Sequence, residues 1–224
     1  VHQARNSSRR GNKIPFRRRI DSSKPIYRQN RCCKNGSDHR FRFPSGPLEK
    51  KRTIVICGET GSGKTVLTRA LLKSLHKDER VIILEDVHEV TVDHVVEAVY
   101  MMYGDAGKIG RVSATDALRA CMRLTPGRII MTELRDDAAW DYLKALNTGH
   151  PGGVMSTHAN SARDAFNRIG LLIKATPIGR MLDMSDIMRM LYSTIDVVVH
   201  MEKRKIKEIY FDPEYKMQCV NGSL

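Results

Sequence analysis

Short apolar runs recur along the chain from residue 53 onward, and stretches with apolar residues at helical spacing separate them. Three of these runs are rich in β-branched residues and end in polar or glycine-containing stretches, at residues 53–57, 80–84 and 128–132. Strands that are apolar on both faces are typical of a parallel sheet covered by helices on either side. We therefore expect an α/β fold in which these runs are buried strands.

The stretches between the runs carry the spacing of helices. The first has apolar residues three and four positions apart, at Val66, Leu67, Ala70, Leu71 and Leu75. Residues 113–116 match the capping box, which predicts a helix that begins at Ser113 and ends before Pro126. Another helix is expected to be capped by Asp136 or Asp137.

The last third of the chain predicts an accessory layer on this core. After a short strand expected at residues 154–157, the pattern of this layer indicates two helices and two further strands, at residues 166–173, 184–191, 195–200 and 206–210. The last two strands would form a hairpin whose second strand alternates and so lies at the edge of the sheet. Residues 90–110 fit a helix or a strand equally well. The expected fold is a doubly wound α/β core with a helical and β-hairpin C-terminal part.

The positive charge of the chain is concentrated near its beginning. The formal net charge is +13, and residues 1–52 hold 16 lysines and arginines against 3 aspartates and glutamates. The residues from 53 onward carry 22 of each and are balanced. Residues 1–47 show no apolar periodicity, so we expect a basic, disordered segment there and a folded domain over residues 48–224. The basic segment could contact nucleic acid or anionic lipid, or it could be a tail without a role.

The composition excludes several classes of protein. The cysteines form no C-x-x-C pair and no zinc spacing, and their odd number fits a reducing compartment: Cys32, Cys33, Cys57, Cys121 and Cys219. No apolar run approaches the roughly 18 residues of a membrane span, and the basic beginning lacks the apolar core of a secretory signal. We therefore expect a cytoplasmic protein.

Residues 58–65 match G-x-x-x-x-G-K-[ST], the phosphate-binding loop of nucleoside triphosphatases. The residues of this motif are Gly58, Glu59, Thr60, Gly61, Ser62, Gly63, Lys64 and Thr65. Its glycines let backbone N–H groups point at phosphate oxygens, while Lys64 would reach the β- and γ-phosphates and Thr65 would bind Mg²⁺. The expected strand before it and helix after it provide the required context. The sequence therefore predicts a site for a nucleotide and Mg²⁺.

Acidic residues follow the second and third apolar runs, where a parallel sheet places its chemistry. Glu85, Asp86 and Glu89 come after the second run, and Glu133 comes directly after the third. Carboxylates at such positions can hold Mg²⁺ or orient an attacking water. Glu85 and Glu133 are therefore candidate metal ligands, and Glu89 and Glu133 are candidate catalytic residues. A simple polar turn is the alternative for the first three.

Two histidines bracket the strand expected at residues 154–157. His150 precedes this strand and His158 follows it. A pair of histidines at this position could sense a γ-phosphate, although each could equally be a structural residue.

The order of these motifs resembles the secretion-ATPase superfamily, the hexameric motors of type IV secretion, type II secretion and type IV pili. The motifs that carry the resemblance are the phosphate loop, Glu85-Asp86 with Glu89, Glu133-Leu134-Arg135-Asp136, and Thr148-Gly149-His150 with Thr157-His158. The histidine spacing and the Asp-Asp-Ala-Ala-Trp after Arg135 are most similar to the type IV secretion branch. The resemblance covers about residues 48–212.

This resemblance implies a RecA-like P-loop ATPase that uses ATP and Mg²⁺. It implies a motor subunit of a type IV secretion system that powers DNA or protein export, as in conjugation, or pilus assembly. The subunit would form a homo-hexamer and would bind other secretion-machine subunits at the inner membrane. It would be cytoplasmic or peripheral on the inner face of that membrane. The absence of an [NT]-K-x-D guanine motif agrees with ATP as the nucleotide.

The resemblance also implies residue roles. Lys64 and Thr65 would hold phosphate and Mg²⁺, and Glu89 or Glu133 would be the general base. We favour Glu133 for positioning the metal and water, with Glu89 assisting. His150 and His158 would lie near the γ-phosphate. Any of three arginines could reach the nucleotide of a neighbouring subunit: Arg119, Arg123 and Arg135.

Two departures from the family pattern leave alternatives open. Residues 1–47 have no recognisable counterpart to the folded N-terminal domain of the family, and Gly127 stands where the family has an aspartate. The chain could therefore be a truncated remnant that binds ATP without productive turnover. It could also be a basic nucleic-acid-binding module in which ATP is a structural ligand.

Overall fold

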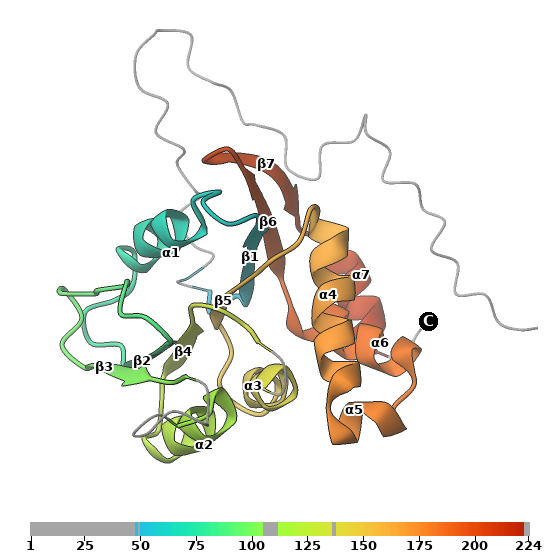
Figure 1. Ribbon diagram of the computed structural model, residues 1–224, viewed down its shortest axis with the longest axis horizontal. Helices are drawn as coiled ribbons and strands as arrows, with labels where there is room; N and C mark the ends of the chain where they lie inside the picture. The colour runs from blue at the N-terminus through green and yellow to red at the C-terminus, as the bar shows by residue number, and fades with distance from the viewer. Residues whose placement is uncertain (1–47, 49, 105–111, 136–137, 222–224) are drawn as a thin grey trace, which may run out of the picture.

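The computed structural model describes residues 48, 50–104, 112–135 and 138–221. They form a seven-stranded sheet in the order β3-β2-β4-β5-β1-β6-β7 (Figure 1). The strands are β1 (Ile54–Gly58), β2 (Val81–Glu85), β3 (Ala98–Met102), β4 (Arg128–Met131), β5 (Val154–Thr157), β6 (Val197–Glu202) and β7 (Lys205–Tyr210). Neighbouring strands are parallel except β6 and β7, which are antiparallel. The expected α/β class with a β-hairpin at the sheet edge is confirmed.

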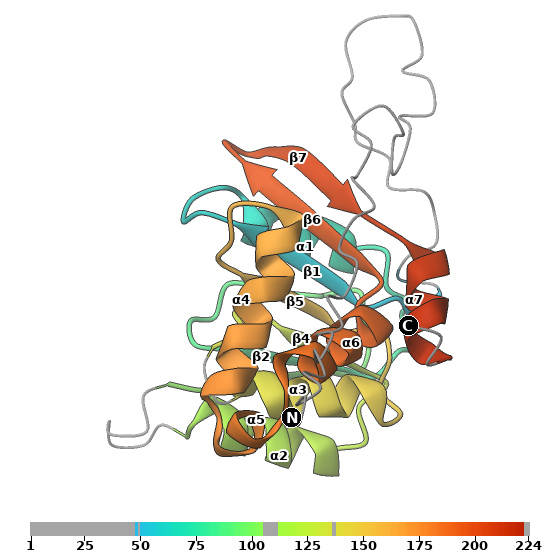
Figure 2. The ribbon, with the colours of Figure 1, turned by 90° about the vertical axis from the view of Figure 1, so that its right-hand side faces the viewer.

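Helices cover both faces of this sheet. They are α1 (Lys64–Leu72), α2 (Ala114–Arg123), α3 (Ala138–Asn147), α4 (Ala162–Ala175), α5 (Pro177–Met181), α6 (Met184–Thr194) and α7 (Pro213–Val220). Figures 1 and 2 show α4, α6 and α7 grouped on one side of the sheet and α1 on the other. None of the helices in these described residues is long and apolar enough to cross a membrane.

The alternation of side chains along β1 divides the core into two layers. Val55 and Cys57 are fully buried against the face that packs on α2, α3, α4 and α6. Ile54 and Ile56 are fully buried on the opposite face, with Leu71 and Leu72 of α1. Because successive strand residues point to opposite faces, an apolar run without interruption fits only a strand covered on both sides.

Side-chain caps fix where the helices begin. The Ser113 hydroxyl accepts a hydrogen bond from the backbone N–H of Asp116 at 3.0 Å, which confirms the predicted start of α2. Ser161 caps α4 in the same way through the N–H of Asp164 at 3.0 Å. This cap places the start of α4 before residue 166, where the periodicity had indicated it.

Most predicted elements agree with the structure. The strands expected at residues 53–57, 80–84, 128–132 and 154–157 match β1, β2, β4 and β5 to within a residue, and the ambiguous stretch 90–110 contains β3. The short helices α5 and α7 were not predicted. The predicted cap at Asp136 or Asp137 and the basic segment 1–47 lie outside the described residues.

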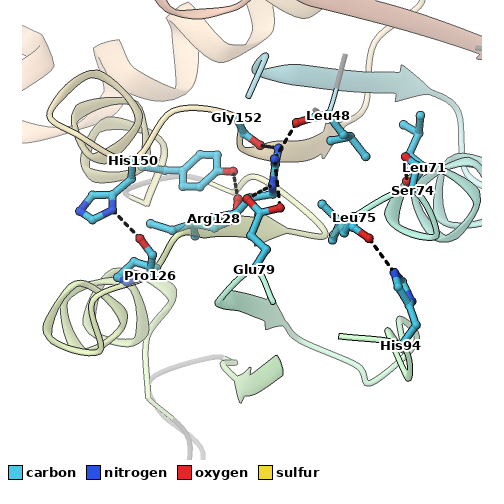
Figure 3. Close-up of polar contacts among 12 residues, drawn as sticks. Leu48, Leu71, Ser74, Leu75, Glu79, His94, Pro126, Arg128, His150 and Gly152 are labelled. Carbon is cyan, nitrogen blue, oxygen red and sulfur yellow. Dashed lines mark hydrogen bonds and ion pairs between the residues drawn. The ribbon is translucent and has the colours of Figure 1, made fainter. Parts of the chain in front are cut away.

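A buried arginine joins several loops at the edge of the sheet where β4 begins (Figure 3). The Arg128 side chain is 1% exposed, and its Nε donates to Glu79 Oε1 at 3.0 Å. Its two terminal nitrogens donate to the carbonyl oxygens of Gly152 at 2.5 Å and Leu48 at 2.8 Å. The guanidinium group thus ties together the segment before β1, the loop before β2 and the loop before β5.

Candidate functional site

The loop between β1 and α1 takes a path that only glycine permits at its start. Gly58, Gly61 and Gly63 have φ angles of 150°, 74° and 97°, in the region that other residues rarely adopt. A Cβ atom on Gly58 would lie 2.3 Å from the carbonyl oxygen of Met201 in β6. The motif glycines therefore serve both the backbone conformation and the close contact with the neighbouring strand.

Several features of this loop fit a bound phosphate group. A Cβ atom on Gly61 would have no neighbour within 4 Å, so the middle of the loop faces open space. Ser62 is 5% exposed, and its Oγ has no hydrogen-bond partner among the described residues. Helix α1 begins at Lys64 with no acidic residue in its first turn, which leaves the positive end of its dipole free for an anion. A triphosphate supplies the acceptors that this arrangement needs.

Lys64 holds its ammonium group over the loop. Its Nζ donates to the carbonyl oxygens of Gly58 and Glu59, each at 2.9 Å. Burial lowers the pKa of Lys64, and the negative charge of Glu133 opposes that shift. Lys64 and Glu133 therefore act on each other electrostatically, although they follow different strands.

An ion-pair network lies at the carboxyl end of β4. Arg135 Nη2 lies 2.7 Å from Glu133 Oε2 and 2.7 Å from Asp86 Oδ2. His158 Nε2 lies 3.6 Å from the other oxygen of Glu133, Oε1. The ends of β2, β4 and β5 thus bring Asp86, Glu133 and His158 together, as the parallel arrangement predicts.

The charge of Glu133 is stabilised by this network. The hydrogen bond from Arg135 lowers the pKa of Glu133, and burial opposes this. The charges of Arg135 and Lys64, and that of His158 when it is protonated, add to the lowering. The same contact raises the pKa of Arg135. Glu133 is therefore a carboxylate near neutral pH, suited to holding a cation or orienting a water and less suited to accepting a proton.

The surroundings of Glu85 do not fit the role of metal ligand that the sequence suggested for it. Its side chain is fully buried, and Oε1 accepts hydrogen bonds from the backbone N–H groups of Glu89 at 3.3 Å and Val90 at 3.0 Å. Oε2 lies 3.0 Å from Nδ1 of His88. Because the carboxylate is used within its own turn, we leave Glu85 out of the proposed metal ligands.

Glu89 lies in the turn that the Glu85 carboxylate stabilises through its hydrogen bonds. Its side chain is exposed, and its carbonyl oxygen accepts a hydrogen bond from Arg69 of α1. This bond ties the turn to the helix that follows the phosphate loop.

The two histidines lie at opposite ends of β5. His158 follows the strand beside Glu133, whereas Nδ1 of His150 lies 2.9 Å from the carbonyl oxygen of Pro126, which precedes β4 (Figure 3). A four-residue strand rises by roughly 13 Å, so within one chain the structure does not bring His150 to the phosphate loop.

An open cavity of about 560 Å³ adjoins the phosphate loop on the side of α4. It is lined by Glu59, Thr60, His158, Ala159, Asn160, Asp164 and Arg168. The cavity joins the start of the loop to His158, so a group that occupies the loop has room beside it.

The other two candidate arginines lie away from this site. The Arg119 side chain is exposed on α2, 3.7 Å from Asp116 and 3.7 Å from Asp141 of α3. Arg123 is exposed near the end of the same helix. Among the three candidates, Arg135 contacts the acidic residues of the site directly.

Sequence reasoning missed two residues of the site. Asp86 was seen only as part of an acidic turn, yet it is the second carboxylate on Arg135. The hydroxyl of Tyr103 donates to the carbonyl oxygen of Glu133 at 2.8 Å, and its N–H donates to the carbonyl oxygen of Glu85 at 2.8 Å. A tyrosine directly after an ambiguous strand gave no signal for this role.

Comparisons with known proteins agree with this geometry. Residues 42–208 match the family described as "Type II/IV secretion system protein". Over 185 residues the chain is 37% identical to the type IV secretion system protein VirB11 of Bartonella henselae, covering 80% of this chain and 51% of that protein. It is 40% identical over 159 residues to the type IV secretion system protein PtlH of Bordetella pertussis, covering 70% and 47%. The chain thus spans about half the length of these relatives.

Solved structures show the same fold. The VirB11 ATPase of the Brucella suis type IV secretion system, in complex with sulphate, superposes with a TM-score of 0.73 at 36% identity over 78% of this chain and 52% of that one. The Legionella pneumophila ATPase DotB gives a TM-score of 0.58 at 20% identity, covering 80% and 49%, and supports the fold alone. The RecA-like P-loop architecture is therefore confirmed.

Proposed function

The chain belongs to the type II/IV secretion system protein family, and from this premise we propose that it is the ATP-hydrolysing part of a type IV secretion motor. The observation that carries the proposal is the meeting of the phosphate loop with Glu133 and His158 at one edge of the sheet. A loop that binds phosphate needs no carboxylate beside it, but hydrolysis needs a group that holds the metal or the water.

The loop residues bind and orient the triphosphate in this proposal. Backbone N–H groups of the loop would face the phosphates, apart from that of Ser62, which donates to the carbonyl oxygen of Glu59 at 3.2 Å. The Lys64 ammonium group would neutralise the β- and γ-phosphates. The Thr65 hydroxyl and Glu133 would hold Mg²⁺, and the ion would stabilise the negative charge of the phosphates. The Lys64 ammonium group already lies beside the loop carbonyls, so rotation of its side chain would bring it to a phosphate bound in the loop.

Glu133 and its neighbours handle the attacking water in this proposal. Arg135 keeps Glu133 charged, and His158, which lies 3.6 Å from the same carboxylate, would contact the γ-phosphate. Since Glu133 is a weak proton acceptor in this setting, Glu89 remains a candidate general base. The exposed Glu89 carboxylate is tethered through its backbone to α1, which begins at the phosphate loop.

The wider role follows from the relatives, which are type IV secretion system proteins. We propose a homo-hexameric motor that acts with other secretion-machine subunits and powers DNA or protein export or pilus assembly. A location in the cytoplasm or on the inner face of the inner membrane fits this role. In the same proposal, one of three arginines reaches the nucleotide of a neighbouring subunit. Arg119 and Arg123 are exposed and lie outside the ion-pair network that holds Arg135.

The test is Mg²⁺-dependent ATP hydrolysis by the full chain, with and without DNA. Turnover that requires both Mg²⁺ and Lys64 supports the motor. Tight binding of ATP without turnover would instead indicate a remnant that only binds nucleotide. Salt-sensitive DNA binding with no hydrolysis would indicate a nucleic-acid-binding module, a second candidate that the basic charge of residues 1–52 favours.

A further inference from the structure

The turn between β6 and β7 adopts an unusual backbone conformation. Lys203 and Arg204 connect the two strands and have φ angles of 49° and 61°. Two-residue hairpin turns with positive φ at both central positions normally contain asparagine and glycine, because other side chains are strained there. The side chains of Lys203 and Arg204 are exposed, so burial of these side chains does not account for the conformation.

This turn contacts the phosphate loop through its backbone. The N–H of Arg204 donates to the carbonyl oxygen of Ser62 at 3.1 Å. A Cβ atom on Gly63 would lie 3.5 Å from the Cα of Arg204, so the two backbones are in close contact. Figures 1 and 2 both show the tip of the hairpin beside the segment that leads into α1.

A second contact comes from the strand itself. The pairing of β6 with β7 shifts register between His200 and Met201, as at a β-bulge. The carbonyl oxygen of Met201 then faces Gly58, where a Cβ atom would come within 2.3 Å of it. The hairpin therefore contacts the loop at its beginning and again at Ser62 and Gly63.

The Arg204 bond leaves the loop donors available. In a trans peptide the C=O and the following N–H point in opposite directions. A Ser62 carbonyl directed at the hairpin therefore turns the N–H of Gly63 away from the hairpin and toward the side where a phosphate would lie. The bond also occupies an acceptor of the loop and none of its backbone donors.

We propose that the β6–β7 turn is a positioning element of the nucleotide site, and that the backbone N–H of Arg204 sets the orientation of the Ser62–Gly63 peptide. The proposal rests on the proposed function for its nucleotide but not for the contact itself. Nucleotide affinity then depends on a turn that no phosphate-loop motif includes. The backbone is the active part, and the two basic side chains are dispensable.

Two variants of the full chain separate the backbone from the side chains. The double substitution Lys203→Asn with Arg204→Gly removes both positive charges but keeps the N–H and suits the turn. Arg204→Pro removes the N–H, and the proline ring requires a φ of about −65°. A second disrupting variant inserts two glycines between Lys203 and Arg204, which moves the N–H away from Ser62 without placing proline in the chain.

Two measurements report on each variant. Amide hydrogen exchange of residues 58–65 without nucleotide follows the loop itself, and the affinity for Mg²⁺ with a slowly hydrolysed ATP analogue follows the site. Both disrupting variants should speed loop exchange and weaken analogue binding by about tenfold, as expected for the loss of one hydrogen bond. The asparagine–glycine variant should stay within about twofold of wild type in both measurements.

The outcomes are distinct. The proposal is overturned if the glycine insertion changes neither measurement, or if the asparagine–glycine variant weakens binding as much as the disrupting variants do. The latter result would show that the charges act. If wild type binds no nucleotide while loop exchange still responds to the insertion, the contact stands and the proposed function fails. A melting curve for each variant shows whether the rest of the fold is intact.

Discussion

The guanidinium nitrogen Nη2 of Arg135 lies 2.7 Å from the carboxylate oxygen Oε2 of Glu133. This contact lowers the pKa of Glu133 and so keeps its negative charge to lower pH. Loss of activity on acidification, where it reflects protonation of Glu133, should therefore occur at lower pH than for an unpaired glutamate. The pairing sets both the direction and the ionisation of the residue next to the phosphate loop.

Arg135→Ala should move the acid limb of the ATPase pH profile to higher pH. Without the guanidinium group the pKa of Glu133 rises toward its ordinary value, so protonation begins earlier as the pH falls. The rate of hydrolysis measured across the acid range checks this, with Arg180→Ala on the exposed surface of α5 as the control. A uniform loss of rate with an unmoved acid limb would reduce Arg135 to a structural role.

Glu133→Gln should separate binding from turnover. The amide keeps the shape of the side chain but not its charge, so nucleotide affinity should survive while hydrolysis falls by about a hundredfold or more. Steady-state hydrolysis and analogue binding measure the two effects. The matched control is Glu97→Gln, an exposed residue at the opposite end of the sheet that pairs with Arg80. Turnover within a few-fold of wild type would transfer the catalytic role to Glu89.

Lys64→Ala should abolish detectable nucleotide binding. The ammonium group lies over the loop carbonyls and is the cation best placed to neutralise the β- and γ-phosphates. Titration with a fluorescent ATP analogue measures the affinity, and Lys73→Ala at the exposed end of α1 is the control. Unchanged binding of Mg²⁺ and ATP by Lys64→Ala would contradict the nucleotide site.

Arg128→Met should destabilise the fold by about 3–5 kcal/mol, because it leaves a carboxylate and two carbonyl groups without their buried partner. Glu79→Gln should cost less, since the amide oxygen can still accept a hydrogen bond from the guanidinium group. Urea unfolding of both variants gives the two free energies. An Arg128→Met protein as stable as wild type would mean that the three loops do not need this connection.

Removal of residues 1–47 should abolish salt-sensitive binding to DNA or anionic vesicles. The residues from 53 onward are electrostatically neutral, and counterion release makes binding by a basic segment weaken steeply with salt. Binding of the full and shortened chains at two salt concentrations measures the effect, with ATP affinity as the internal control. A shortened chain that binds DNA equally well would place the binding surface in the folded domain.

The buried strands could be predicted because burial on both faces leaves one characteristic pattern. Ile54, Ile82 and Ile129 lie in runs without a polar interruption, and all three are fully buried. Strand β3 could not be read in this way, since it lies at the sheet edge with Tyr100 and Met102 exposed. Unlike β7, in which polar and apolar residues alternate, β3 is apolar throughout and shows no alternation that would mark it as an edge strand.

The two missed helices are short but did carry signals. Thr176 caps α5 before Pro177, and Asp212 caps α7 before Pro213. Proline at the first helical position after a capping residue is a recognised start signal. Apolar periodicity alone fails for such helices because one or two turns contain too few buried positions.

The site was predicted where motif and strand end coincide, as at Lys64 and Glu133. The separation of His150 from His158 could also have been deduced, because the strand between them was itself predicted. Asp86 could not be distinguished from Glu85 by sequence, since both are acids at the same strand end. The structure distinguishes them because Glu85 is buried within its own turn and Asp86 reaches Arg135.

The strand order has a consequence for how this protein is made. Strand β1, which carries the phosphate loop, lies between β5 and β6, so Ile54 is paired with Val154 and Val197. A ribosome produces β1 well before it produces Val154 and Val197. Pairings between strands so far apart in the sequence slow folding. We expect chains truncated before Val197 to leave β1 open to protease, and chains truncated after Tyr210 to protect it. The strand that carries the phosphate loop is thus synthesised before both of its neighbours, and until they are made its unpaired edges are open to aggregation.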